Sequence, residues 1–301
     1  MRTGKTELRS PLGILATATA AHGTGRDDDI PLPRPSGFVE SSFSPLAYEV
    51  SRLCLTERPG DGSRTAVALA SLMGDTITAD LASRRMVSGQ VHNPMLFMQA
   101  TPNSILGYVS REFGITGQMF SLSTLDDPVA ELLAMADLLL EDPGLDRVLV
   151  LAVELSGGGR SEKGAPGGRV AAAYRELTAD TGRPVPPPPH SAIAGLAAAV
   201  LLGRPGAETP VSVRSTEPYG EAPHADDTGT ASPPGSIQGL FELAAAHRRL
   251  LRDGGSHLLV ADPAAGGRPA AFTLTTHTSA LTTVLTNARP ARNETENHAD
   301  Q

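Results

Sequence analysis

The chain has 301 residues, of which 40% are hydrophobic, and it carries a formal charge of −8. A chain of this length can bury one large core or two modest ones, and the negative charge without basic runs argues against nucleic acid as a partner. No segment offers the roughly 18 consecutive apolar residues of a membrane span. The single cysteine, Cys54, excludes an internal disulfide and indicates a reducing cytoplasm.

The start of the chain and the histidines narrow the class further. Glu7, Arg9 and Pro11 interrupt the first apolar run, so the N-terminus does not have the profile of a signal peptide. The eight histidines are scattered without the spacing of metal ligands. We therefore expect a cytoplasmic protein with no metal, no cofactor and no membrane contact.

The first third of the chain alternates apolar runs with helical segments. Pro45 suits the first turn of a helix, and Leu46, Val50 and Leu53 recur at a helical spacing. We expect a strand at 12–20, a loop at 23–36, a helix at 45–55, a strand at 65–73 and a helix at 76–85.

The stretch from Asn93 to Leu155 predicts a helix, a short strand, a sharp turn, a second helix and a long strand. In the first helix, which we place at 102–113, Ile105, Val109 and Phe113 repeat every four residues after an opening Pro102. The short strand is expected at 119–122, and the second helix from Pro128 to Leu140 with Asp127 as its N-cap. The long strand at 147–155 is almost wholly apolar, as in the interior of a mixed or parallel sheet.

The sharp turn before Pro128 is where a reactive side chain is expected, because it lies at the positive end of the second helix. The turn reads Leu125-Asp126-Asp127-Pro128 and has no cysteine, serine or histidine at its tip. A carboxylate at a helix N-terminus is stabilised as an anion by backbone N–H groups, so Asp126 and Asp127 are interpreted as capping residues.

The last half of the chain is interrupted by polar segments. Residues 156–189 are rich in Gly, Ser, Arg and Pro, which predicts an exposed excursion with a short helix at 170–177. A span at 216–234 has the composition of disorder, and the tail after Ser279 is expected to be mobile. The remaining elements are strands at 193–202, from 211, at 257–261 and at 269–275, with an amphipathic helix at 237–252. Strands alternating with helices indicate an α/β layered fold.

The run PNSILGYVSREFGITGQMFSLST resembles β-ketoacyl synthases of the thiolase superfamily, which carry a similar Pro-Asn helix, glycine turn, short strand and nucleophile turn. The likeness continues through Glu131-Leu132-Leu133 and the strand at 148–155, and through 193–203 and 237–275. It implies a thiolase-like α-β-α-β-α fold with an abbreviated C-terminal half. The expected organisation is an N-terminal half at 1–203, a truncated half at 204–278 and a tail at 279–301.

The departures from that family concern its catalytic groups. Counted from Gly117, the family's cysteine position is occupied by Asp126, and neither of the two histidine motifs is present. His224, in the stretch PHADDTGT, echoes one of them only faintly, and His190 and His257 are expected to be structural. Cys54 is expected to be a small buried hydrophobe rather than a nucleophile.

A ketosynthase-like chain without its nucleophile resembles the chain-length factor of a type II polyketide synthase. That resemblance implies a heterodimer with a catalytic ketosynthase, served by an acyl carrier protein whose phosphopantetheine carries the acyl chain. The short strand would pair with the partner through Met119, Phe120, Ser121 and Leu122. The tunnel wall would include Met73, Phe97, Met98 and Thr101, with Phe97 as a stop for the growing chain. The other interpretation of Phe97 and Met98 is ordinary core packing.

Two further functions remain open at this point. The chain could be a divergent acyltransferase or malonyl decarboxylase that acts through Asp126 or Ser123. It could also be a stand-alone homodimeric module that binds acyl chains without a ketosynthase partner.

Overall fold

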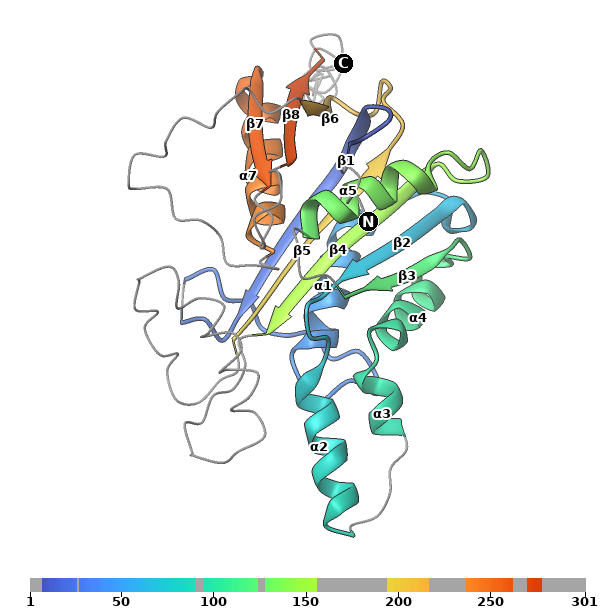
Figure 1. Cartoon of the computed structure of the whole chain (residues 1–301), viewed down its shortest axis with the longest axis vertical. Coiled ribbons are helices and arrows are strands. Elements are labelled where there is room, and N and C mark those ends of the chain that lie inside the picture. The colour runs from blue at the N-terminus through green and yellow to red at the C-terminus, as the bar shows by residue number, and fades with distance from the viewer. Residues whose placement is uncertain are drawn as a thin grey trace, which may run out of the picture.

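Eight strands form one mixed sheet in the order β3-β2-β4-β5-β1-β6-β8-β7 (Figure 1). The computed structural model describes residues 7–25, 27–89, 95–123, 128–155, 194–216, 237–261 and 270–277. The strands are β1 (Leu12–His22), β2 (Thr65–Ala70), β3 (Met119–Leu122), β4 (Arg147–Leu155), β5 (Gly195–Gly203), β6 (Val211–Thr216), β7 (Ser256–Ala261) and β8 (Ala270–Thr276).

Helices cover both faces of this sheet. The helices of the described residues are α1 (Phe43–Glu57), α2 (Thr76–Val87), α3 (Met95–Ala100), α4 (Pro102–Phe113), α5 (Pro128–Leu139) and α7 (Gln238–Asp253), with a 3₁₀ turn η1 (Gly62–Arg64). Of these, α1, α4, α5 and α7 pack on the sheet. Each helix in the described part of the chain is too short or too polar to cross a lipid bilayer.

The direction of the strands divides the sheet. Strand β2 runs parallel to β3 and β4, whereas β5 runs antiparallel to both β4 and β1. On the other side of β1 the pairs β1–β6, β6–β8 and β8–β7 are all antiparallel. The short β1–β6 ladder, Leu12↔Val213 to Ile14↔Val211, joins the two parts into one sheet.

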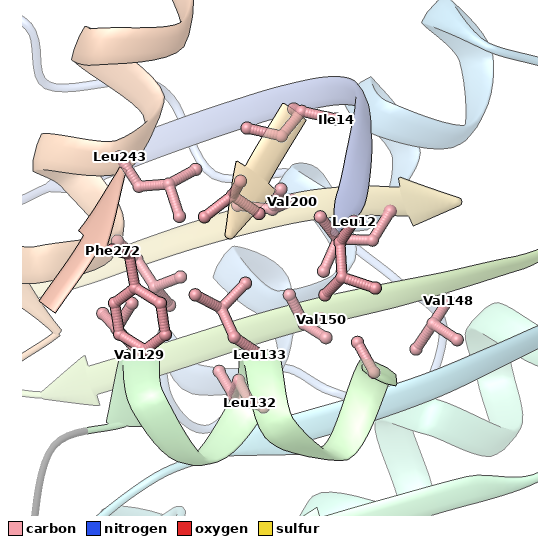
Figure 2. Packing of buried hydrophobic residues seen from close by; sticks show 14 of the residues in the cluster. Leu12, Ile14, Val129, Leu132, Leu133, Val148, Val150, Val200, Leu243 and Phe272 are labelled. Atoms are coloured by element: carbon pink, nitrogen blue, oxygen red, sulfur yellow. The ribbon is translucent and has the colours of Figure 1, made fainter. Parts of the chain in front are cut away.

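Two apolar cores lie on opposite faces of the sheet. Helices α5 and α7 pack on one face, where Leu133, Leu243 and Phe272 meet Val150 and Val200 from the central strands (Figure 2). Helices α1 and α4 cover the other face and bury Leu149, Leu151 and Leu201 among others. Strand β4 is apolar because it contributes to both cores, so its sequence does not alternate.

The second half repeats part of the first. The order β4-β5-β1 recurs as β7-β8-β6, with β5 and β8 each antiparallel to both neighbours. Helix α5 precedes and packs on β4, as α7 precedes and packs on β7. Beyond β4 the first half continues with β2 and β3, but among the described residues no strand follows β7. The described residues of the second half therefore contain no counterparts of β2 and β3.

In the second half, the face of the sheet that points away from α7 is polar, whereas the corresponding face of the first half is apolar. Arg214, Thr273 and Thr275 point away from α7, since the alternate residues of β6 and β8 belong to the core beneath that helix. The corresponding face of β4 and β5 is buried under α1. An antiparallel sheet with one polar face can remain in water, and within the described ranges the face of β6 and β8 that no helix covers carries polar residues.

Most predicted elements are present with shifted ends, and α4, β3 and β4 have the predicted bounds. The prediction of a strand to Met73 was wrong: β2 ends at Ala70, and Ser71 to Asp75 form a loop in which Gly74 has φ +64°. The short helix α3 was not predicted. The helix expected at 170–177 and the capping residue Asp127 lie outside the described residues.

Candidate functional site

The carboxyl ends of the parallel strands β2, β3 and β4 meet at one edge of the sheet, where ligand sites in α/β folds usually form. Ser123 follows β3 at this edge, and its Oγ donates a hydrogen bond of 3.0 Å to the carbonyl oxygen of Leu72. Among the described contacts of Ser123 no histidine or carboxylate serves as a base. Its hydroxyl therefore ties the end of β3 to the loop after β2. Asp126, the other residue considered as a reactive group, lies outside the described residues.

Cys54 is fully buried in α1, and its Sγ lies 3.7 Å from the carbonyl oxygen of Ala199. Burial raises the pKa of the Cys54 thiol far above its ordinary value, with a smaller contribution from Glu57. Because the thiolate is the nucleophile, this thiol is inert. The expectation of a small buried hydrophobe is confirmed.

None of the histidines in the described part of the chain is hydrogen-bonded to Ser123, and each is held by another group. His22 Nδ1 lies 2.9 Å from the carbonyl oxygen of Ile30, and His277 Nε2 lies 2.9 Å from Ser212 Oγ. His257 contacts Arg249 at the end of α7. His190 and His224 lie outside the described residues, so their predicted roles stay predictions. No group of three or more potential ligand side chains that could hold a metal ion occurs in the described ranges.

His247 is the one described histidine that is buried. Its Nδ1 lies 3.2 Å from Thr17 Oγ1 on β1, and its Nε2 has no partner among the described residues. Burial lowers the pKa of His247 to about 4, and the positive charges of Arg58 and Arg248 act in the same direction. The ring is therefore neutral at pH 7 and stabilises the packing of α7 on β1.

Strand β3 ends the sheet and leaves one side of its backbone unpaired within the described chain. The amides of Val67 and Ser71 donate to the carbonyl oxygens of Gln118 and Leu122. In a parallel ladder alternate residues face the neighbouring strand, so the backbone groups of Met119 and Ser121 point toward the free edge. The side chains of these two residues are exposed, whereas Phe120 and Leu122 are half-buried against the core beneath α5.

The junction of α3 and α4 presents two large apolar side chains at the surface. Phe97 is 42% exposed and Met98 is 58% exposed, so neither belongs to the core of this chain. Thr101 holds the junction in place: its backbone N–H and Oγ1 both donate to the carbonyl oxygen of Met98, at 3.1 and 2.7 Å. Thr101 Oγ1 also lies 2.9 Å from Ser104 Oγ, which fixes the first turn of α4.

The loop after β2 brings Met73 to the same region. A Cβ placed on Gly74 would lie 3.4 Å from Pro102, so this loop packs against the start of α4. Asp75 then caps α2 by accepting from the backbone N–H of Thr78 at 3.1 Å, and it also accepts from Ser41 Oγ at 2.6 Å. Met73 itself is 52% exposed. We call Met73, Phe97, Met98, Thr101 and the free edge of β3 the β3 surface.

A shallow cleft lies where the loop before α1 meets α2 and α3. Its volume is about 170 Å³, and the residues that line it are Phe38, Val39, Glu40, Ser41, Ser44, Asp75, Thr78 and Gln99. Part of this volume is open solvent and no enclosed space remains for even one water molecule, so the cleft offers no cavity for an acyl substrate.

Comparison with known proteins concerns structure alone, because the sequence matches no family model and no curated protein. A chain of the ishigamide ketosynthase/chain length factor superposes with a TM-score of 0.55 at 15% identity, covering 89% of this chain and 99% of that one. A chain of the ketosynthase (ApeO) in complex with its chain length factor (ApeC) from Xenorhabdus doucetiae gives 0.52 at 16% identity, covering 89% and 100%. The chain has a thiolase-like fold.

This thiolase-like fold confirms the predicted fold class. It brings Met73 close to the start of α4 and places Phe97, Met98 and Thr101 together at the α3–α4 junction. Cys54 is not part of this group, because it lies on α1 and faces the core between α1 and the sheet. The sequence did not indicate that Met86 and Met95 are also half-exposed, on α2 and α3. For Met95, the signal in the sequence was the short apolar run at 95–98, which contains no glycine and no β-branched residue.

Proposed function

We propose that this chain is a non-catalytic chain-length factor that pairs with an active ketosynthase in a type II polyketide synthase. The observation that carries the proposal is the β3 surface, where an unpaired strand edge adjoins exposed apolar side chains on a thiolase-like fold. Each of the two similar structures is that of a ketosynthase with its chain length factor, which supports this pairing by analogy.

The physics of the β3 surface favours a protein partner. Met119 and Ser121 direct backbone N–H and C=O groups outward, and such an edge accepts a further strand from another chain. Met73 lies on the loop that Ser123 ties to the end of β3, and Phe97 and Met98 are exposed at the α3–α4 junction. Association would remove this apolar area from water. We infer that the partner's edge strand extends the sheet beyond β3.

Among the described residues, the environments of Ser123 and Cys54 support a role without acyl transfer. Ser123 donates its hydroxyl proton to a backbone carbonyl, and the Cys54 thiol is buried with a raised pKa. The sequence has Asp126 at the position of the family's cysteine. The ketosynthase would therefore hold the acyl group, which an acyl carrier protein delivers on its phosphopantetheine.

The proposed contribution of this chain is the depth of the partner's tunnel. Phe97 and Met98 sit on a junction fixed by Thr101, and Met73 lies on a loop packed against the same helix. Side chains held in this way at an interface can close a tunnel that enters from the other subunit. We assign Phe97 as the stop, since a bulky ring in a narrow apolar space admits no additional methylene groups.

Ser121→Pro tests the pairing of β3. Proline removes the N–H that points to the free edge, while the ladder to β2 uses the backbone groups of Phe120 and Leu122. We expect the variant to fold normally and to bind a candidate ketosynthase at least tenfold more weakly than the wild type, as measured by size-exclusion chromatography and calorimetry. Ser121→Thr is the matched control, because threonine keeps the N–H and suits a strand, and it should pair normally.

The outcomes separate the proposed functions. A one-to-one complex that Ser121→Pro weakens supports the chain-length factor. A homodimer indifferent to the ketosynthase would support the acyl-binding module instead. Condensing activity of the purified chain alone would exclude the non-catalytic role.

A further inference from the structure

Exposed methionines occur on the loop after β2, on α2, on α3 and on β3. Six of the seven methionines of the sequence lie in the described residues, and five of these six are exposed: Met73 (52%), Met86 (50%), Met95 (50%), Met98 (58%) and Met119 (39%). Methionine is normally among the more buried residue types. By contrast, Met135 on α5 is partly buried against the core.

The five exposed methionines come from adjoining elements. They lie on the loop after β2, on α2, on α3 and on β3, and α2 packs on α3, α3 on α4, and α4 on β3. Figure 1 shows α2 and α3 projecting from the end of the sheet where β3 lies. Met73, Met98 and Met119 belong to the β3 surface, whereas Met86 lies at the far end of α2 and Met95 at the start of α3.

These thioethers are the accessible sulfur atoms of the described chain, because the only thiol is buried and its pKa is raised. A peroxide oxidises a thioether without a catalyst. The sulfur lone pair attacks one peroxide oxygen, the O–O bond breaks, and the second oxygen leaves as water after taking the remaining proton. The sulfur loses two electrons and the peroxide gains them, and the product is a polar, chiral sulfoxide.

We propose that Met73, Met98 and Met119 form a peroxide-sensitive modification site, and that their oxidation in the free chain prevents pairing with the ketosynthase. This inference rests on the proposed function. A sulfoxide oxygen is a strong acceptor that loses its water when the surface is covered, so an interface built for thioethers leaves it unsatisfied. Pairing would in turn shield the sulfur atoms from peroxide, so the modification acts before assembly.

The test treats the free chain with hydrogen peroxide and maps the oxidation by peptide mass spectrometry. We expect sulfoxide at Met73, Met86, Met95, Met98 and Met119 before Met135, with an unchanged circular dichroism spectrum. The oxidised chain should bind untreated ketosynthase at least tenfold more weakly than the untreated chain. Methionine sulfoxide reductases A and B should restore the binding, since each reduces one sulfoxide epimer.

A triple variant, Met73→Leu, Met98→Leu and Met119→Leu, separates these residues from general damage. Peroxide should change its dissociation constant less than twofold relative to the same variant untreated. Unchanged affinity of the oxidised wild-type chain would overturn the inference and leave the proposed function standing. The inference would also fall if the triple variant lost as much affinity on treatment as the wild type. If the untreated chain does not bind the ketosynthase, both proposals fail.

Discussion

Phe97 is 42% exposed, yet it stands on a junction held by two hydrogen bonds to the carbonyl oxygen of Met98. A large apolar side chain costs free energy when it faces water, and a fixed backbone prevents it from folding back into the core. Such a residue contributes little to the stability of its own chain. The chain-length factor proposal places this side chain at an interface.

Phe97→Ala should therefore leave folding almost unchanged and lengthen the product. We expect the free energy of unfolding to change by less than about 1 kcal/mol, because the ring is not a core side chain. In the complex, the polyketide should gain at least one extension unit, which mass spectrometry of the products measures. Val87→Ala, at the far end of α2 where the side chain is 87% exposed, is the control and should leave the product unchanged. Products of unchanged length from a folded Phe97→Ala complex would contradict the assignment of the stop.

His247 gives the chain a defined response to acid. The pKa of His247 in the folded state is about 4, below the ordinary value of 6.5. Between pH 4 and pH 6.5 the unfolded state therefore binds a proton that the native state does not bind. Above pH 6.5 the ring is neutral in both states, and its packing contributes fully. As the pH falls toward 4, the unfolded state is favoured by up to about 1.4 kcal/mol per pH unit.

His247→Asn should remove this dependence, because asparagine does not titrate and can still bond to Thr17. Between pH 7.5 and pH 5.0, the free energy of unfolding of the wild type should fall by about 2 kcal/mol more than that of the variant. Urea unfolding at the two pH values measures the difference. His257→Asn, at a residue near the end of α7 that is far less buried, is the control. Equal pH dependence in the wild type and His247→Asn would show that another group dominates.

At the level of elements, the position of β3 depends on how closely its preceding turn approaches β2. A Cβ placed on Gly117 would lie 2.2 Å from the carbonyl oxygen of Thr65, which is backbone and cannot move aside cheaply. Gly107 lies in α4, and a Cβ there would meet nothing within 4 Å. The two glycines therefore have opposite roles: one permits a close backbone approach, and the other only lowers the stability of a helix.

Gly117→Ala should destabilise the chain by about 2 kcal/mol or more, since a backbone clash forces β3 away from β2. Gly107→Ala should stabilise it by about 0.5–1 kcal/mol, the usual gain when alanine replaces glycine within a helix. Thermal and urea unfolding of the two variants give the comparison. Similar effects of both substitutions would mean that the approach of the turn to β2 does not fix β3.

The elements that could be predicted from the sequence are those with a regular pattern. Helix α4 has its apolar residues at a four-residue spacing between Pro102 and Gly114, and β4 is a continuous apolar run, so their bounds were predicted correctly. Helix α3 was missed because it spans only six residues and exposes Met95, Phe97 and Met98. Apolar side chains that face a surface do not follow the periodicity of a core, so neither α3 nor the exposed methionines could be read from it.

For the whole molecule, the thiolase-like fold followed from the sequence, but the polar outer face of the second half did not. The repeat of β4-β5-β1 as β7-β8-β6 makes the difference visible: α1 covers the first set, and threonine side chains face outward on the second. A chain that keeps β2 and β3 in the first half retains the edge needed for pairing. It can lose the counterparts of these strands in the second half without losing that edge.

The central claim is that this chain shapes a partner's cavity and does not itself carry the acyl group. The most direct test incubates the complex of this chain and its ketosynthase with an acyl thioester and measures the intact mass of both chains. The account predicts that the ketosynthase gains the mass of one acyl group and that this chain stays unmodified. An acyl adduct on this chain, abolished by Asp126→Ala or Ser123→Ala, would contradict it.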